Sequence, residues 1–202
     1  VFDIALHFGT LLAVLLYYWR DWLQIALQGF GLKWGNDEEL KGNPRLLWLI
    51  AAASVPIGIA GWLLHDYAEG PWHTNYLLMG GMLVGVGLLM GLADRLGKRQ
   101  RRLSELGLRD ALVIGVAQAL AVVPGTSRSG ITITAALFRN LDRPAAARFS
   151  FLVSTPAITA AALKSFWDLH QQGGIPADMR MAFAIGVLAS GLTGWAFIAI
   201  LI

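Results

Sequence analysis

The stretch 111-ALVIGVAQALAVVPGTSRSGITITAALF-138 decides the fold, because its apolar run is interrupted by Pro124-Gly125 and by Arg128. A single spanning helix here would place a charged arginine deep in hydrocarbon, at a cost of at least a few kcal/mol. Pro124-Gly125 would also break that helix. Irregular backbone at membrane depth is tolerated only where protein surrounds it or a cavity adjoins it. We therefore predict a re-entrant hairpin, with half-helices over about Ala111–Val123 and Ile131–Phe138 joined by the loop Pro124–Gly130.

The whole chain has the composition of a membrane protein. Of its 202 residues, 56% are hydrophobic and 14% are charged, against about 25% charged residues in a typical soluble domain. This excludes disorder, a nucleic-acid-binding module and an ordinary soluble enzyme. The net charge of +3 indicates membrane topology rather than a nucleic-acid partner. The chain has no Cys, so it has no disulfide framework and no thiolate nucleophile.

Besides the hairpin, five segments are apolar enough to cross a bilayer, which takes about 20 residues. They are Ile4–Trp19, Leu46–Leu64, Tyr76–Ala93, Phe149–Leu163 and Met181–Ile202. The prediction is an all-α polytopic membrane protein, organised as a single membrane domain over residues 1–202. It consists of three spans in residues 1–93, a basic loop over 94–110, the re-entrant pair over 111–138 and two spans in 147–202.

Lysine and arginine are concentrated in alternate loops, and cytoplasmic loops carry such an excess. The segment Trp22–Arg45 and the loop Asp94–Asp110 contain them, whereas His65–Asn75 has none. We expect the first two to be cytoplasmic and the third to lie outside. Arg139, Arg143 and Arg148 follow the hairpin, so a Lys/Arg-rich connection leaves it on the cytoplasmic side.

The loop of the hairpin has the chemistry of a phosphate cradle. Gly125 and Gly130 allow backbone N–H groups to converge, next to a helix N-terminus that favours an anion. Arg128 adds a planar, permanently charged fork that fits phosphate oxygens. Hydroxyl donors come from Thr126, Ser127, Ser129 and Thr132. The alternative is that Arg128 pairs with a buried carboxylate or with carbonyl groups and only braces the fold.

These residues resemble a signature of the bacterial undecaprenyl-pyrophosphate phosphatases, the bacitracin-resistance membrane phosphatase family. The signature Pro-Gly-x-Ser-Arg-Ser-x-x-Thr is met at Pro124, Gly125, Ser127, Arg128, Ser129 and Thr132. The resemblance extends to Phe2–Val14, Phe149–Leu152 and Pro156, and covers nearly the whole chain. It implies a bundle of two inverted repeats in the bacterial inner membrane, with the pocket opening to the periplasm. Each repeat has a re-entrant pair followed by three spanning helices.

The resemblance also implies the reaction, which is hydrolysis of undecaprenyl pyrophosphate to undecaprenyl phosphate and inorganic phosphate. This recycles the lipid carrier for cell-wall synthesis. Arg128 would hold the pyrophosphate and its transition state, and Ser127 would be the nucleophile or a close phosphate ligand. The other predicted phosphate-binding residues are Gly125, Thr126, Ser129, Gly130, Thr132 and Gln118. Gln118 would line the pocket, or instead be a buried side chain bonded to backbone.

Two parts of the family plan have no counterpart in this sequence. A first re-entrant pair, with Glu-x-x-x-Glu and Ser-Ser-x-Gly-His runs, should precede Val1, and a last spanning helix should follow Ile202. We therefore expect the chain to be a fragment that holds half of the site. The base that activates Ser127, and the carboxylate ligands of any Mg²⁺ or Ca²⁺, are expected in the missing pair. No His, Asp and Glu spacing in the chain itself makes a metal site.

Two other functions share parts of this pattern. Relatives of phosphatidate phosphatases need Ser-Arg-x5-His-x3-Asp, and Thr134 and Phe138 stand where its His and Asp would be. Secondary transporters also aim broken-helix N-termini at an anion, so a lipid-phosphate transporter or flippase is the alternative function. The expected partners are a polyprenyl pyrophosphate lipid and membrane lipids, with no nucleic acid. A glycine face suits close helix contact, by default within the chain and otherwise in a homodimer. It consists of Gly80, Gly81, Gly85, Gly87 and Gly91.

Overall fold

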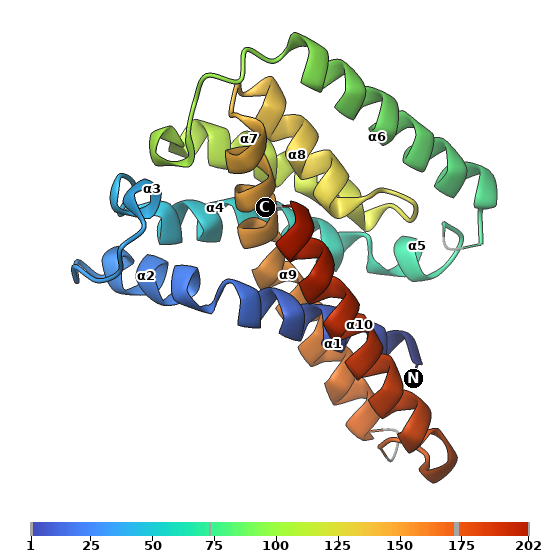
Figure 1. Ribbon diagram of the computed structural model, residues 1–202. Coiled ribbons are helices and arrows are strands. Elements are labelled where there is room, and N and C mark those ends of the chain that lie inside the picture. The colour runs from blue at the N-terminus through green and yellow to red at the C-terminus, as the bar shows by residue number, and fades with distance from the viewer. Residues whose placement is uncertain (1, 73, 172–173, 202) are drawn as a thin grey trace. The chain divides into compact units, whose positions relative to one another are not determined.

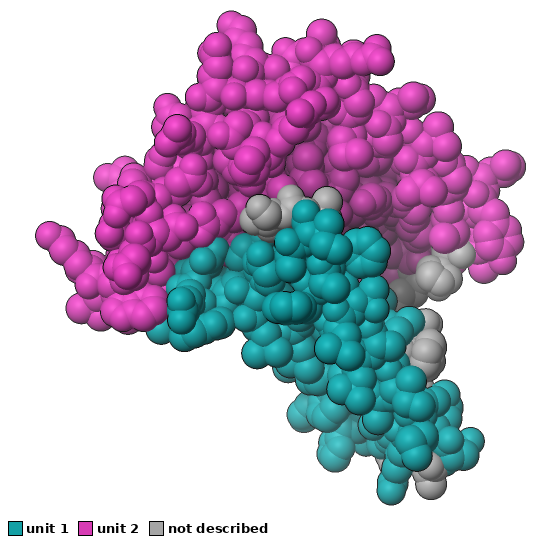
Figure 2. Space-filling model, viewed as in Figure 1, with its two compact units in different colours: residues 1–23, 155–202 teal, residues 24–154 magenta. Residues whose placement is uncertain are grey.

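The computed structural model describes residues 2–72, 74–171 and 174–201 (Figure 1). These ranges contain helices and, in place of strands, one isolated bridge between Arg101 and Leu141. The chain forms two compact units. Unit 1 holds residues 1–23 and 155–202, and unit 2 holds residues 24–154 (Figure 2). The all-α polytopic class is confirmed, whereas the single membrane domain and the inverted repeats stay predictions.

Within the described ranges, four helices are long and apolar enough to cross a membrane. They are α4 (Leu46–Leu63), α6 (Tyr76–Leu96), α9 (Arg143–Gln171) and α10 (Arg180–Leu201). The first predicted span differs from expectation. Its helix, α1 (Phe2–Tyr17), is apolar but shorter than the other four. Trp19, which we expected to end that span, begins a separate helix, α2 (Trp19–Gly29).

Two segments predicted as connections contain helices. The basic segment Trp22–Arg45 includes most of α2 and the short α3 (Glu38–Lys41), which Asp37 caps by accepting a hydrogen bond from the Leu40 N–H at 3.0 Å. The predicted outer loop His65–Asn75 begins with α5 (His65–Glu69). Charge marks which side of a membrane a segment favours, but it does not prevent a segment from being helical.

The connection after the hairpin is also shorter than predicted. Helix α9 begins at Arg143 rather than near Phe149, so Arg143 and Arg148 lie on it. Asp142 starts the helix, because its Oδ1 accepts a hydrogen bond from the Ala145 N–H at 2.8 Å. A side-chain acceptor of this kind satisfies one of the N–H groups that a helix leaves unpaired in its first turn.

Unit 1 is built around two helices that approach closely. Helix α1 packs along α10, and α10 also contacts the short turn η3 (Ala177–Met179). The unit includes the part of α9 from Thr155 onward. A Cβ at Gly9 would collide with Val187 and Ser190 of α10. Small residues let helix backbones approach one another in this way.

Unit 2 contains the predicted hairpin. Helix α7 (Leu108–Ala119) continues into η2 (Leu120–Val122), and α8 (Arg128–Phe138) returns beside it (Figure 1). Helix α4 packs against α7, and α6 packs against α8, so the hairpin has a long apolar helix on each side. The loop is shorter than Pro124–Gly130, because Ser127 caps α8. The helix therefore begins at Arg128 rather than at Ile131.

Glycine allows the hairpin to contact both flanking helices. A Cβ at Gly115 of α7 would collide with the backbone of Ala53 on α4. A Cβ at Gly125 in the loop would collide with the backbone of Met79 on α6, and Gly125 also has a φ of +87°. The loop therefore lies against the first turn of α6 at a position that only glycine can occupy without strain.

The glycine face on the rest of α6 has no such contact. A Cβ at Gly80, Gly81, Gly85, Gly87 or Gly91 would meet no described atom within 4 Å. The contact within the chain that we expected by default is thus not found among the described residues. The homodimer stays a prediction.

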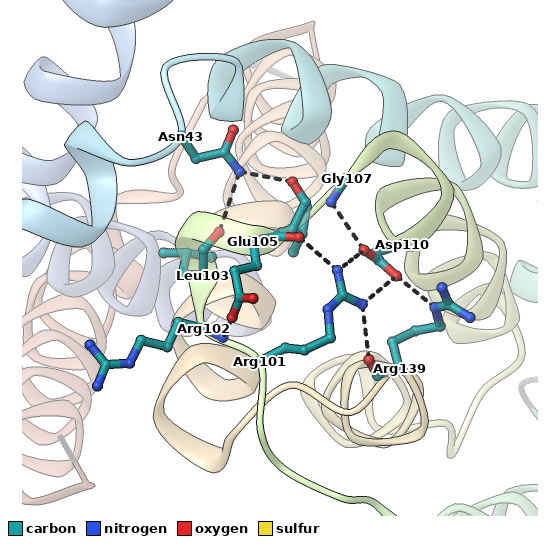
Figure 3. Close-up of polar contacts among 9 residues, drawn as sticks. Asn43, Arg101, Arg102, Leu103, Glu105, Gly107, Asp110 and Arg139 are labelled. Carbon is teal, nitrogen blue, oxygen red and sulfur yellow. Dashed lines mark hydrogen bonds and ion pairs between the residues drawn. The ribbon is translucent and has the colours of Figure 1, made fainter.

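One carboxylate closes the base of the hairpin (Figure 3). Asp110, in the first turn of α7, accepts a hydrogen bond from Arg139 Nε at 2.6 Å, and Arg139 directly follows α8. It also accepts bonds from the two terminal nitrogens of Arg101, at 3.1 and 2.7 Å. The start of α7 and the end of α8 therefore lie together, as a re-entrant pair requires.

The charge of Asp110 is stabilised by its surroundings. Burial alone raises the pKa of this carboxyl, but hydrogen bonds from Arg101, the Gly107 N–H and Arg139 outweigh it and lower the pKa to about 2. The carboxylate is consequently ionised at neutral pH. Arg101 also donates to the carbonyl oxygens of Arg139 (3.1 Å) and Glu105 (2.6 Å).

The basic loop is fastened to the hairpin and to α4. It includes the turn η1 (Leu103–Glu105). Asn43, just before α4, donates from Nδ2 to the carbonyl oxygens of Leu103 (3.3 Å) and Leu106 (2.9 Å) (Figure 3). The Arg101 N–H donates to the Asn140 carbonyl oxygen at 3.0 Å. Part of the positive charge from which we predict a cytoplasmic position for this loop thus also contributes to tertiary structure.

Replacing Asp110 with Asn should destabilise the hairpin, although the new side chain has nearly the same shape. We expect a loss of about 2 kcal/mol, because charge-assisted bonds to two partly exposed arginines are removed. Thermal unfolding followed by circular dichroism at 222 nm measures it. Asp66→Asn is the control, since Asp66 is exposed. Equal melting temperatures for the two variants would contradict the assigned role of Asp110.

Candidate functional site

The loop 124–127 lies at the opposite end of α6 from the base of the hairpin. Its Gly125 abuts Met79, while a Cβ at Gly97 would press on the Leu137 carbonyl near the end of α8. At 1.5 Å per residue, Met79 and Gly97 are on the order of 25 Å apart along α6. The loop that we predict to bind phosphate is therefore separated from the basic loop by most of the length of α6.

Ser127 holds the N-terminus of α8 at this position. Its Oγ accepts a hydrogen bond from the Gly130 N–H at 3.1 Å, and its φ and ψ are extended. The first N–H groups of any α-helix lack acceptors within it. Those of Arg128 and Ser129 have no backbone acceptor in the described structure. With the helix dipole, such groups favour an anion.

Arg128 is the first residue of α8 and is half-buried. Its Nε is buried without a hydrogen-bond partner, and no described carboxylate forms an ion pair with its guanidinium group. The alternative in which Arg128 only braces the fold needs a carboxylate or carbonyl partner. The described part of the chain does not supply one.

Three of the predicted site residues carry buried polar atoms without partners. They are Gln118 (Nε2), Thr126 (Oγ1) and Arg128 (Nε). Such atoms are rare in folded proteins, because each costs about 1–3 kcal/mol of desolvation. Half of the six such atoms in the described residues lie on the two half-helices and the loop between them.

Gln118 is fully buried on α7, less than two turns before the loop. Its Oε1 accepts a hydrogen bond from Ser154 Oγ at 3.4 Å. The alternative for Gln118 was a hydrogen bond from its side chain to a backbone group, and no such bond is found among the described residues. Ser154 fixes one end of the amide and leaves its two N–H donors for another group.

The predicted hydroxyl groups differ in their surroundings. Ser127 and Ser129 are exposed at the end of α8, whereas Thr132 is fully buried one turn further along. Thr132 Oγ1 donates to the Arg128 or Ser129 carbonyl oxygen, at 2.9 and 3.1 Å, and lies 2.6 Å from Ser150 Oγ. The structure thus places Thr132 in a contact with α9 instead of at the exposed surface of the loop.

Sequence reasoning did not single out Ser150 and Ser154, which support the hairpin from the unit 2 part of α9. Ser150 contacts Thr132 and also donates to the Ser129 carbonyl oxygen at 3.4 Å, and Ser154 contacts Gln118. The sequence did indicate them, because Ser150 and Ser154 are four residues apart and therefore share one helix face. Ser and Thr are also common packing residues in membrane helices, so the signal was ambiguous.

These groups together can hold a phosphate. A guanidinium fork, helix N-terminal N–H groups and two exposed hydroxyls all come from Ser127, Arg128 and Ser129. Phosphoryl transfer depends chiefly on such positioning and on neutralisation of oxygen charge. Among the described residues, no group of three or more His, Asp or Glu could hold a metal ion.

Comparison with known proteins shows the family of this chain. The chain matches the family described as bacitracin resistance protein BacA over residues 1–202. It belongs to the BacA family. The match includes both flanking helices and the hairpin, so the resemblance drawn from the loop residues is confirmed.

Curated BacA relatives are similar along this chain. The chain is 45% identical over 208 residues to an undecaprenyl-diphosphatase of Thermomicrobium roseum, covering 100% of this chain and 74% of the relative. It is 42% identical over 202 residues to one of Geobacter metallireducens, with the same coverage of 100% and 74%. A third, from Desulforudis audaxviator, is 42% identical over 195 residues, covering 96% of this chain and 70% of the relative.

Thr132→Val tests the contact that supports the BacA hairpin from α9. The change keeps the shape of the side chain but leaves Ser150 without its 2.6 Å partner, so we expect a loss of about 1 kcal/mol. Thr134→Val is the matched control. Thr134 is also buried, but its hydroxyl donates only to the Gly130 carbonyl of its own helix.

A double-mutant cycle separates the contact from general packing effects. Thermal unfolding of Thr132→Val, Ser150→Ala and the combined variant should give a coupling free energy of about 0.5 kcal/mol or more. Additive effects of the two changes would show that this hydrogen bond does not contribute to stability.

Proposed function

We propose that this chain is the greater part of an undecaprenyl diphosphatase of the bacterial inner membrane. The reaction is hydrolysis of undecaprenyl pyrophosphate to undecaprenyl phosphate and inorganic phosphate, which returns the lipid carrier to cell-wall synthesis. The observation that carries the proposal is the Arg128 guanidinium group, half-buried at the N-terminus of α8 without a described protein partner. Its relatives' printed name, undecaprenyl-diphosphatase, supplies the substrate.

Arg128 and the end of α8 would bind the pyrophosphate and stabilise its transition state. The guanidinium group donates along two directions in one plane, which matches two phosphate oxygens. The N–H groups of Arg128 and Ser129 and the exposed Ser129 hydroxyl add donors. As the bridging P–O bond breaks, negative charge grows on oxygens that these groups already contact, so the transition state is bound more tightly than the substrate.

Ser127 would contact the phosphate, but no described residue activates it as a nucleophile. Its Oγ accepts the Gly130 N–H, which leaves its own proton for donation to a phosphate oxygen. As a nucleophile it would need a base to remove that proton. Among the described residues, no His, Asp or Glu forms a hydrogen bond with Ser127. A role as phosphate ligand needs nothing further, and the nucleophilic role needs a base from outside this loop.

The involvement of Mg²⁺ or Ca²⁺ stays a prediction. Both cations prefer several oxygen ligands, chiefly carboxylates. The described residues lack a suitable group of three, so they do not fit such an ion by themselves. None of the steps above depends on a metal.

We further propose that the loop faces the periplasmic side. It abuts the first turn of α6, which follows the outer segment His65–Asn75. The base of the hairpin lies instead with the basic residues Arg101 and Arg139, and cytoplasmic loops carry such charge. The pyrophosphate would therefore reach the cradle from the side opposite to the basic loop.

Single cysteines can test this orientation because the chain has none of its own. Asp66→Cys should react with a membrane-impermeant maleimide added outside intact cells, and Lys98→Cys should react only after the membrane is opened. Both replaced residues are exposed. Labelling of both from the same side would contradict the proposed topology.

Arg128 variants test the proposed chemistry. In the full-length protein, Arg128→Ala should lower the rate of phosphate release from undecaprenyl pyrophosphate at least about 100-fold, the usual loss when one transition-state donor is removed. Arg128→Lys should recover little, because a point charge does not replace a fork. Release of inorganic phosphate is measured in detergent with Mg²⁺ or Ca²⁺ supplied. The control is Arg109→Ala, an exposed arginine near the base of the hairpin.

The same assay separates a phosphatase from a transporter. Near-normal turnover by Arg128→Ala would refute the cradle. Absence of phosphate release from the unaltered protein, together with movement of the lipid between leaflets of liposomes, would favour the transporter. Assay of the 202-residue chain beside the full-length protein tests whether residues outside this chain complete the site.

A further inference from the structure

A pocket with no assigned function lies in unit 2, between the end of α2 and the start of α4. Its volume is about 480 Å³, and its lining includes Gln28, Leu32, Lys33, Trp34, Lys41 and Pro44. None of the predicted phosphate-cradle residues lines it. It combines two lysines with apolar and aromatic side chains, which is the composition of a site for an amphiphilic anion.

The wall of the pocket is a well-defined turn. At the end of α2, the Leu32 N–H donates to the Leu27 carbonyl oxygen and the Gly31 N–H donates to that of Gln28, both at 2.9 Å. Gly31 has a φ of +84°. This pattern is a Schellman motif, in which a left-handed glycine closes a helix. Gln28 Nε2 also donates to the Trp34 carbonyl oxygen at 3.3 Å, so the turn is bound back to the helix.

The acidic residues near this pocket leave Lys33 and Lys41 able to bind an anion. Asp37 accepts a hydrogen bond from Arg148 at 2.9 Å. Glu38 pairs with Lys41 at 2.7 Å, but the Glu38 side chain is 83% exposed. An exposed pair of this kind contributes at most about 1 kcal/mol, so a phosphate can replace Glu38 as the partner of Lys41. Lys33 is exposed and has no ion-pair partner among the described residues.

Several features place the pocket at the membrane surface. Pro44 lies two residues before the apolar helix α4 begins. The exposed side chains of Phe30 and Trp48 pack edge to face, with ring centroids 6.0 Å apart, and Trp48 Nε1 donates to the Gly29 carbonyl oxygen at 3.1 Å. Tryptophan rings with one bonded polar end are typical of the headgroup level.

We propose that this pocket binds one anionic membrane phospholipid. Its headgroup phosphate lies between Lys33 and Lys41, and the beginning of its acyl chains contacts Leu32 and Trp34. Lysines near a membrane surface attract anionic lipids by roughly 1 kcal/mol each, about fivefold in affinity. The exposed apolar residues beside them provide the surface that a free phosphate ion would not use.

Fluorescence quenching by brominated lipids tests this proposal. The full-length protein is reconstituted with phosphatidylglycerol or phosphatidylcholine that carries bromine near the headgroup end of its acyl chains. The Trp34 contribution is the difference between the unaltered protein and Trp34→Phe. We expect this contribution to be quenched at a several-fold lower mole fraction of phosphatidylglycerol than of phosphatidylcholine. Inorganic phosphate at millimolar concentration should leave the quenching unchanged.

Lysine variants show whether the preference belongs to this pocket. Lys33→Gln and Lys41→Gln should each reduce the preference for phosphatidylglycerol, by up to about fivefold. Lys98→Gln is the matched control, because Lys98 is exposed but does not line the pocket. Phosphate release should be unchanged in all three variants, which shows that they are folded and separates this proposal from the proposed function.

Three results would overturn the proposal. Equal quenching by the two lipids would show that the pocket does not select anionic headgroups. An absence of Trp34 quenching by either would show that no lipid enters it. An effect of Lys98→Gln as large as that of Lys33→Gln would show that only the general positive charge of this side of the protein acts.

Discussion

The hairpin depends on the carboxylate of Asp110, which joins the first turn of α7 to the end of α8. A broken helix in a membrane leaves two short segments, and neither has enough residues to be fixed by spanning the bilayer. Asp110 contacts both Arg101 and Arg139, so the two arms and the basic loop meet at one point. With its base closed there, the hairpin holds its loop against the far end of α6.

Ser127 and Gly125 decide which polar groups the loop presents. Ser127 caps α8 and Gly125 lets the loop approach Met79, so Arg128 enters the first helical turn. Its guanidinium group is thereby kept among buried atoms at a helix N-terminus, where positive charge is opposed by the helix dipole. That arrangement is unfavourable unless an anion is bound, which is why it supports a role in binding phosphate.

Helix α9 adds a second set of constraints from its two serines. Ser150 bonds to Thr132, and Ser154 bonds to Gln118, so one face of α9 contacts both arms of the hairpin. These two bonds hold the Thr132 hydroxyl and the oxygen end of the Gln118 amide in one orientation. The pocket beside Lys33 and Lys41 has a different origin, since a helix-ending glycine motif shapes it and charge at the membrane surface gives it selectivity.

The spacing of charges and helix breakers by itself determined the membrane class, four of the five predicted spans and the hairpin, because hydrocarbon penalises a buried charge and an unpaired backbone wherever they occur. The loop residues also identified the family. Helix α2 was missed, because its arginine, aspartate and tryptophans are equally typical of a membrane-surface connection. Only the tertiary structure decided that Asp110 pairs with Arg139, that Thr132 bonds to α9 and that Arg128 has no described partner. These contacts join residues far apart in the chain, and local propensity carries no information about which of several arginines or hydroxyls a folded helix brings together.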